Sequence, residues 1–320
     1  MKEIGKVFRT CGLLLIMMGI CSQAMSLEPH VPHTPSLRIS LNDWTGQHIS
    51  AHIMGEVLKK AEYRVQYVEV DYLKQIKELT LGNLDFVTEI WATTGKESLD
   101  AGLSTGKIES FSDTGLMSIE EWWYPLYMKE KCPKLPNWRA LNDCAELFAT
   151  PDTAPLGRYL GGPVSWGGYD EERIEALGLK YKVEHVENDA QLYQELDSAY
   201  KAHQPILLWV YAPYWIPDEY AGEWVEFPRY QPECYTNPSW GINPEKTHDC
   251  GKPRGPIWRV VAKHVSVQHP RAYKIFRAFR LNNYEMSRMV KQIDVHHEKL
   301  DDVVAVWMQK NTRRWQAWLN

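Results

Sequence analysis

Strands and helices alternate at the start of the chain, and this order most limits the folds open to it. Residues 37–41 alternate in polarity like a strand, 46–61 show helical spacing of apolar side chains, and 63–70 alternate again. An amphipathic helix over 73–81 and a strand over 86–90 follow. This order predicts a mostly parallel sheet with helices on both faces. In such sheets, ligands bind beyond the carboxyl ends of the strands, where loops converge.

A second region of the chain repeats this mixture of strands and helices. We expect strands at 147–150 and 205–211, helices at 170–178 and 189–203, a loop rich in Pro, Asn and Gly up to 256, and a helical tail over 269–318 with Pro270 in its first turn. With 320 residues the chain exceeds what one hydrophobic core commonly serves, so two lobes are expected.

The first 24 residues have the pattern of a secretory signal peptide. Three basic residues precede the apolar run 11–20, and Ser22-Gln-Ala24 places small residues where a signal peptidase cuts. The run is about half as long as a membrane-spanning helix requires. We therefore expect cleavage after about Ala24 and a periplasmic location. Retention as an anchor is the weaker alternative, as is lipidation of Cys21, because Ile20 stands where a lipobox has a small residue.

Four cysteines remain once the signal peptide is removed: Cys132, Cys144, Cys234 and Cys250. An even number in an oxidising compartment predicts two disulfides. Among three possible connectivities, Cys132–Cys144 and Cys234–Cys250 join neighbours in the sequence and are the natural proposal. Zinc is the competing idea, but the chain has no Cys-x-x-Cys pair and no histidine cluster near these cysteines. We expect no metal and no other cofactor.

The aromatic composition is unusual, with 14 Trp and 17 Tyr beside only 7 Phe. Trp and Tyr combine a polar edge with an electron-rich face that suits ligand binding. The net charge is −5, which argues against a general nucleic-acid binder, because such a protein needs clustered Lys and Arg. With 44% apolar and 24% charged residues, the chain reads as an ordinary globular protein.

Several aromatic residues stand where predicted strands meet loops. Trp44 follows the strand 37–41, Trp91 ends the strand 86–90, and Trp166 precedes two glycines. Trp209 and Tyr211 are two apart on a strand and therefore face the same side. Together such rings predict either a sugar platform or a cage for a quaternary ammonium group, which donates no hydrogen bond and is held by cation–π attraction. Trp307, Trp315 and Trp318 have helical spacing, and we interpret them as packing residues.

The chain resembles the substrate-binding proteins of glycine betaine, proline betaine and choline ABC importers, the quaternary-amine-binding family with the type II periplasmic-binding-protein fold. The similarity is diffuse but covers most of the mature chain. It is carried by Asn42-Asp-Trp-Thr-Gly46, Glu89-Ile-Trp91, Ser165-Trp-Gly-Gly168, Leu208-Trp-Val-Tyr-Ala-Pro-Tyr-Trp215 and Asn311-Thr-Arg-Arg-Trp-Gln-Ala-Trp318. The Pro-Tyr-Trp element and the Trp before it are the more specific parts.

The resemblance implies two lobes, each a mostly parallel sheet flanked by helices, with the ligand in the cleft between them and closure by hinge motion. It divides the chain into a signal peptide at 1–24, a discontinuous first lobe at 25–128 plus 223–320, and a second lobe at 129–222. Trp44 and Trp91 are then expected on one lobe, and Trp166 with Trp209 or Tyr211 on the other. Trp123, on a crossing strand, is a further candidate ring.

The other end of the ligand needs its own partners. For a betaine carboxylate we expect the backbone N–H groups of Gly167 and Gly168, or those of residues 45–46 at a helix start. Tyr214 stands where some relatives have a carboxylate-binding His, so its hydroxyl is another candidate. For choline, Asp43 is a candidate acceptor of the hydroxyl, with a helix N-cap as the alternative role.

The sequence lacks the usual motifs of hydrolases, nucleotide-binding enzymes and redox enzymes. The chain has no Gly-x-Ser-x-Gly, no Walker loop and no dinucleotide fingerprint. A secreted glycosidase would need paired carboxylates, but we interpret Glu120-Glu121 and Glu171-Glu172 as solvated helix-like faces. His48 and His52, four apart on a predicted helix, have no third ligand nearby, and we interpret them as a solvated or packed pair.

We therefore predict a binding protein without catalytic residues: the periplasmic substrate-binding component of an ABC importer. It captures glycine betaine, proline betaine or choline in an aromatic cage and delivers it to a membrane permease. We expect a monomer with no nucleic-acid partner. The alternatives are a receptor of the same fold for a sugar or another polar metabolite, and a secreted glycosidase.

Overall fold

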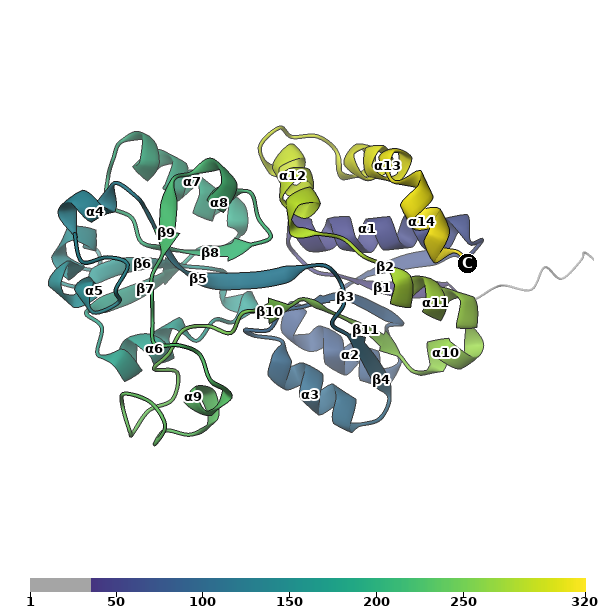
Figure 1. Cartoon of the computed structure of the whole chain (residues 1–320), viewed down its shortest axis with the longest axis horizontal. Helices are drawn as coiled ribbons and strands as arrows, with labels where there is room; N and C mark the ends of the chain where they lie inside the picture. Colours follow the sequence, from purple (N-terminus) through teal and green to yellow (C-terminus); the bar gives the residue numbers. More distant parts are fainter. Residues whose placement is uncertain (1–35) are drawn as a thin grey trace, which may run out of the picture. The chain divides into compact units, whose positions relative to one another are not determined.

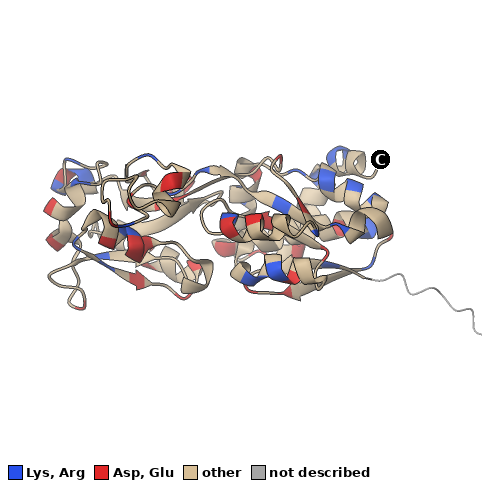
Figure 2. Ribbon diagram, turned by 90° about the horizontal axis from the view of Figure 1, so that it is seen from below, with Lys and Arg blue, Asp and Glu red and all other residues tan. Residues whose placement is uncertain are grey.

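The computed structural model describes residues 36–320 (Figure 1). The predicted signal peptide, its cleavage site and Cys21 lie outside the described residues. Within the described part of the chain, no helix is both long and apolar enough to cross a membrane. Acidic and basic side chains are interspersed over the helices (Figure 2).

The first sheet has the strand order β2-β1-β3-β11-β4. Its strands are β1 (Leu37–Leu41), β2 (Val65–Glu69), β3 (Phe86–Ile90), β4 (Ile108–Phe111) and β11 (Trp258–Ala262). β1 pairs in parallel with β2 and β3, whereas β11 runs antiparallel between β3 and β4. The three strands predicted at the start of the chain are confirmed, and every strand of this sheet except β11 runs in one direction.

Helices cover both faces of the first sheet. They are α1 (Thr45–Lys60), the 3-10 turn η1 (Tyr72–Lys74), α2 (Gln75–Leu81), α3 (Lys96–Ser104), α10 (His264–Gln268), α11 (Pro270–Ala278), α12 (Asn283–Asp294), α13 (Leu300–Lys310) and α14 (Thr312–Trp318). Figure 1 shows α1, α12 and α13 on one side of the sheet and α2 and α3 on the other. The α1 side chains Ile49, Ile53 and Val57 are fully buried, as their helical spacing predicts.

The helical tail is confirmed. Pro270 stands in the first turn of α11, and α12 begins with a capping box between Asn282 and Glu285. Trp307 and Trp318 are buried, and their ring centroids lie 6.1 Å apart. These tryptophans are packing residues, as their spacing indicated.

The second sheet has the order β10-β5-β8-β6-β7, with β9 beside β5. Its strands are β5 (Met117–Pro125), β6 (Gly157–Gly161), β7 (Tyr181–His185), β8 (Leu208–Ala212), β9 (Gly222–Trp224) and β10 (Gly255–Pro256). β6 pairs in parallel with β7 and β8, and β5 runs antiparallel to β8, β9 and β10. The prediction of two mostly parallel sheets flanked by helices is therefore confirmed.

Short helices and two longer ones surround the second sheet. They are α4 (Met128–Lys131), α5 (Ala140–Asp143), the 3-10 turns η2 (Ala145–Phe148) and η3 (Val164–Trp166), α6 (Asp170–Leu177), α7 (Asp189–Lys201), α8 (Ile216–Glu219) and α9 (Pro232–Thr236). The helices expected at 170–178 and 189–203 are confirmed as α6 and α7.

The strand expected at 147–150 is wrong. Residues 145–148 form η2, and Ala149 makes only an isolated bridge to Gly157. Phe148 is buried with its ring centroid 6.1 Å from that of Tyr181, which anchors the turn over the sheet. The strand lies further on, at β6, where Gly157 is required because a Cβ there would be 2.5 Å from the Tyr181 ring.

By sheet membership, the chain changes sheets between β4 and β5 and again between β10 and β11. β5 pairs with β8 and therefore belongs to the second sheet. By contrast, we expected residues up to 128 in the first lobe. As boundaries between lobes, residues 128/129 and 222/223 stay a prediction.

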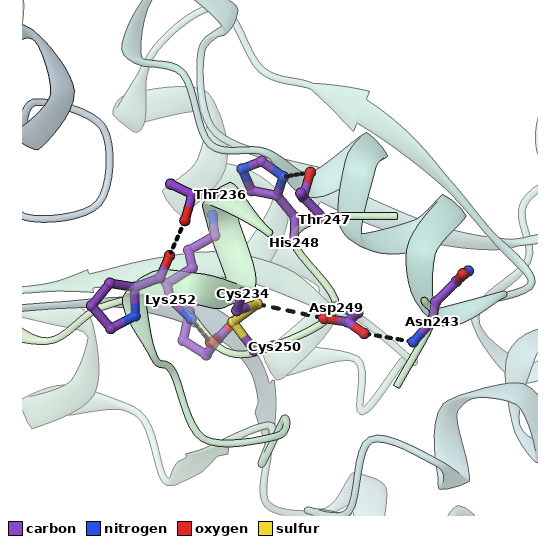
Figure 3. Close-up of a disulfide and its surroundings, with 10 residues drawn as sticks. Cys234, Thr236, Asn243, Thr247, His248, Asp249, Cys250 and Lys252 are labelled. Carbon is purple, nitrogen blue, oxygen red and sulfur yellow. Dashed lines mark hydrogen bonds between the residues drawn. A yellow bond between two sulfur atoms is a disulfide. The ribbon is translucent and has the colours of Figure 1, made fainter. Parts of the chain in front are cut away.

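Both expected disulfides are present. Cys132 pairs with Cys144 across 12 residues, and Cys234 pairs with Cys250 across 16 residues. Figure 3 shows the second disulfide with the side chains around it. Because these four cysteines are paired, none of them is free to bind zinc.

Candidate ligand pocket

Aromatic side chains from both sheets surround one cavity of about 30 Å³. The lining residues are Trp44, Tyr72, Trp91, Thr94, Glu120, Trp166, Trp209 and Tyr211. Five of the predicted ring residues thus line one pocket, and Trp209 and Tyr211 both do so.

Glu89 on β3 holds the two tryptophans of the first sheet. Its Oε2 accepts hydrogen bonds from Trp44 Nε1 at 3.3 Å and Trp91 Nε1 at 3.2 Å, and its Oε1 accepts one from the Ser50 hydroxyl at 2.5 Å. The side chain is only 2% exposed. Burial raises the pKa of Glu89, and these three donors oppose that shift. One buried carboxyl group therefore fixes the orientation of two indole rings.

Trp166 is held from a different direction. Its indole Nε1 donates to Asp43 Oδ1 at 2.7 Å, so a carboxylate beside the first sheet fixes a ring that follows β6. Gly167 has φ 76° and ψ −162°, a conformation that is essentially restricted to glycine. A Cβ at Gly167 would also lie 3.1 Å from the Thr94 methyl group. The glycine thus lets the Trp166 turn approach Thr94.

The rings form a continuous wall. Centroids are 5.6 Å apart for Trp44 and Trp166 and 5.6 Å apart for Trp166 and Trp209. Trp209 stacks on Tyr211 at 4.9 Å, and Tyr211 meets the edge of Trp91 at 5.6 Å. Such edge and stacked contacts fix the positions of neighbouring rings and leave other faces toward the cavity.

Glu120 on β5 is the acidic residue of the pocket lining. It is 8% exposed, and its Oε2 has no hydrogen-bond partner among the described residues. Burial raises the pKa of Glu120, whereas the Lys252 charge and the neighbouring Thr93 hydroxyl lower it. The buried carboxyl group therefore holds its proton to a higher pH than an exposed Glu. Among the described residues that line the pocket, none is Lys or Arg.

Tyr72 and Thr94 complete the polar lining. The Tyr72 hydroxyl accepts the backbone N–H of Trp91 at 2.9 Å, which fixes the strand end that carries this Trp. The Tyr211 hydroxyl is buried without a hydrogen-bond partner among the described residues. The pocket therefore offers a carboxyl group and hydroxyl groups to a bound ligand.

Two predicted rings lie outside this lining. Trp123 is buried against Gly222 of β9, where an added Cβ would be 1.8 Å from its ring, so this side chain packs inside the second sheet. Tyr214 stacks behind Tyr211 at 4.5 Å, and its hydroxyl lies next to the Asp294 carboxyl group. Their proposed contact with ligand has no support in this geometry.

The expected partners for a carboxylate are also placed differently. The Gly167 N–H donates to Val164 O at 3.1 Å, and Gly168, with φ 154°, lies against the Asp170 carboxylate. Asp43 is exposed and accepts the Trp166 indole N–H instead of lining the pocket. Its alternative role as an N-cap is wrong, because α1 begins after Trp44 with no side-chain cap.

The expectation that residues 120 and 121 are solvated is also wrong. Both carboxylates are buried on β5, because this strand lies inside the second sheet, and they do not form a solvated helix face. Glu171 and Glu172 are exposed in the first turn of α6, as expected. His48 Nε2 lies 2.5 Å from Asn42 O, and His52 stacks on Tyr67 with ring centroids 4.2 Å apart. In residues 36–320, no three His, Cys, Asp or Glu side chains gather as a metal site.

The sequence reading missed Tyr72, Glu89, Thr94 and Glu120. Glu89 had a visible signal, because it is a single acid within the otherwise apolar end of a strand. Tyr72 stands where the strand 63–70 passes into a helix, the kind of junction that identified the tryptophans. Glu120 had no comparable signal, since its burial depends on β5 pairing inside the second sheet.

Residues 35–310 match the family described as the substrate binding domain of the ABC-type glycine betaine transport system. The chain belongs to this family. Its members are transport proteins that bind a substrate for an ABC transporter. The family resemblance inferred from the aromatic motifs is thus confirmed.

A curated relative is the trimethylamine N-oxide-binding protein of Pelagibacter ubique (strain HTCC1062). It is 28% identical over 306 residues, which cover 93% of this chain and 92% of that protein.

Solved structures share the fold. Lactococcal OpuAC, closed on glycine betaine, has a TM-score of 0.68 at 14% identity and covers 89% of this chain and 99% of its own. ProX from Borrelia burgdorferi, a glycine betaine/L-proline-binding protein, has a TM-score of 0.69 at 16% identity, with 89% and 97% covered. An ABC-transporter choline-binding protein in complex with choline has a TM-score of 0.67 at 12% identity, with 89% and 91% covered.

Replacing Gly167 with Ala tests the Trp166 turn. We expect Gly167→Ala to lower the free energy of unfolding by about 1–3 kcal/mol, because alanine is strained in this conformation and its methyl group meets Thr94. Gly82→Ala is the matched control, since Gly82 has φ 82° and ψ 16° with no atom within 4 Å of an added Cβ, and it should cost less. Urea unfolding of both variants measures the difference, and equal costs would contradict the account.

Proposed function

We propose that this chain is the substrate-binding component of an ABC importer and that it captures a small trimethylated amine in the aromatic pocket. The observation that carries the proposal is the ring wall with a buried carboxyl group and, among the described residues that line it, no Lys or Arg. Each ring facing a desolvated ammonium contributes about 0.5–2 kcal/mol. Several rings together approach the roughly 8 kcal/mol of a micromolar complex, and the polar lining supplies the rest.

The polar lining supports trimethylamine N-oxide as the first candidate. Its oxygen is bonded directly to the nitrogen and accepts hydrogen bonds, so a protonated Glu120 suits it as a donor, and burial favours that proton. The relative from Pelagibacter ubique is described as a trimethylamine N-oxide-binding protein. A betaine carboxylate has less support, because the pocket lining offers it no cationic side chain and the Gly167 N–H is already engaged.

Choline is the second candidate, and Glu120 is again the reason. In its ionised form the Glu120 carboxylate accepts a hydrogen bond from the hydroxyl of choline and offsets the positive charge of its ammonium group. The solved choline-binding relative has the same fold. Glycine betaine and proline betaine, which the sequence reading placed beside choline, remain in the test.

The family supports a proposal for the remaining steps of transport. We propose export to the periplasm after cleavage near Ala24, action as a monomer, and delivery of the ligand to a membrane permease without chemical change. Trp44 and Trp91 follow strands of the first sheet, whereas Trp166 and Trp209 belong to the second. A ring wall assembled from two sheets supports closure around ligand by a hinge motion.

A calorimetric panel tests the ligand class. We expect trimethylamine N-oxide to bind at micromolar or tighter affinity, choline more weakly, and glycine betaine and proline betaine more weakly still. Binding of a sugar, with no response to any methylated amine, would reject the proposal in favour of another receptor of this fold. Turnover of any panel member would point to an enzyme.

Single ring deletions test the pocket. Trp91→Ala or Trp166→Ala is expected to weaken binding about 30-fold or more, because each removes about 2 kcal/mol of cation–π attraction. Trp240→Ala serves as the control, since Trp240 is 37% exposed and does not line the pocket. Circular dichroism checks that the folds persist. Unchanged affinity in both pocket variants would refute the ring wall as the binding site.

The pH dependence tests the role of Glu120. A protonated Glu120 donates to the N-oxide, so affinity for trimethylamine N-oxide should fall as pH rises through the raised pKa of Glu120. An ionised Glu120 attracts a permanent cation, so affinity for choline should rise over the same interval. Glu120→Gln should flatten both profiles. Parallel profiles for the two ligands in the unmodified protein would contradict this role.

A further inference from the structure

A buried ion pair that does not line the pocket is bonded to Glu121 and Trp122, the residues that follow the pocket residue Glu120 on β5. We infer that the buried Lys252–Asp170 charge pair, which is bonded to the two residues after Glu120 on β5, selects which ligand oxygen the pocket accepts. The inference rests on the proposed function and identifies two specificity-determining residues, neither of which lines the pocket. They are positioning residues that act through Glu120.

The geometry of the pair is tightly constrained. The Lys252 side chain is fully buried, and its Nζ lies 3.1 Å from each carboxylate oxygen of Asp170. The backbone N–H of Lys252 donates to Glu121 Oε2 at 3.0 Å, which fixes the lysine beside β5. Asp170 Oδ1 also accepts the indole N–H of Trp122 at 2.8 Å. Neither charge can turn into solvent without losing these contacts.

The disulfide-closed loop brings Lys252 to this position. Lys252 follows Cys250 by two residues, and the Cys234–Cys250 disulfide is clamped by a hydrogen bond from His248 N to Cys234 O at 2.8 Å. Inside the loop, the buried Asp249 accepts the Asn243 N–H at 2.7 Å (Figure 3).

The same loop is tied to α6, the helix that begins with Asp170. Asn243 Nδ2 donates to Ala176 O at 3.0 Å near the end of α6, while Lys252 binds Asp170 at its start. The loop and the residue Lys252 just after it thus contact both ends of the helix that follows the Trp166 turn. Gly168 in that turn has φ 154°, and a Cβ there would be in tight contact with Asp170 Oδ2 at 3.0 Å.

The charges around Glu120 do not cancel locally. Lys252 and the Thr93 hydroxyl lower the pKa of Glu120, whereas Asp170 and Glu121 raise it. Glu120 in turn raises the pKa of Tyr72, which also lines the pocket. Arg173 is committed to Glu121 by an ion pair, and Lys252 is committed to Asp170. Glu120 is therefore left without a cation of its own, so that its charge responds to the balance of its neighbours and to a cationic ligand.

Lys252 and Asp170 shift the pKa of Glu120 in opposite directions. The positive charge of Lys252 lowers the pKa of Glu120, and the negative charge of Asp170 raises it. Loss of Lys252 therefore favours the protonated form, which donates to an N-oxide. Loss of Asp170 favours the ionised form, which accepts a hydroxyl and attracts a permanent cation. A purely structural pair would instead weaken all ligands together.

The test compares Lys252→Met with Asp170→Asn in the otherwise unchanged chain. Carboxyl ¹³C NMR follows the titration of Glu120 without ligand, and calorimetry follows trimethylamine N-oxide and tetramethylammonium, a cation with no oxygen. We expect the Glu120 midpoint to rise by about one pH unit in Lys252→Met and to fall by about one in Asp170→Asn. The affinity ratio of N-oxide to tetramethylammonium should shift about tenfold up in the first variant and down in the second.

Two further variants keep the test decisive. Lys246→Met is the control, because Lys246 lies in the same loop but forms an exposed pair with Glu175, and it should leave the midpoint unchanged. Lys252→Arg retains the cation and should keep the Glu120 midpoint of the unmodified protein. If Lys252→Met does not fold, Asp170→Asn tests the inference alone. Unmoved midpoints, or shifts in the same direction, would overturn the inference. Shifted midpoints in a protein that binds no methylated amine would instead reject the proposed function.

Discussion

Carboxyl groups that accept indole N–H groups determine the structure of the pocket. A buried indole N–H needs an acceptor, and a ring held only by packing would be free to turn its edge toward the cavity. Glu89 satisfies Trp44 and Trp91 together, and Asp43 satisfies Trp166. With their polar edges bound to acids, these rings are fixed in orientation.

On the function proposed here, the charges around the pocket determine which class of ligand it binds. The described lining of the cavity contains no basic residue. Glu120 stands inside that lining, while the nearby cations Lys252 and Arg173 are paired with other acids. Under that proposal, a trimethylated ammonium supplies positive charge to this site, and an attached oxygen meets the Glu120 carboxyl group.

Local sequence patterns predicted the elements and the ring positions well, because alternation and helical spacing record which faces are buried. Trp44 and Trp91 were found from their places at strand ends, and the disulfides from cysteine spacing. Partners set by tertiary pairing were missed. Glu120 seemed solvated because nothing local shows that β5 enters the second sheet, and Trp123 was expected in the pocket although the pairing with β9 turns it against Gly222.

Proton exchange on binding tests most directly whether Glu120 recognises the oxygen atom of the ligand. Calorimetry in two buffers of different ionisation enthalpy, at a pH near the Glu120 midpoint, gives the protons taken up or released per ligand bound. Our account predicts proton uptake with trimethylamine N-oxide and proton release with choline, since the first ligand selects the protonated carboxyl group and the second the carboxylate. Binding of both ligands with no proton exchange, or with exchange of the same sign, would contradict it.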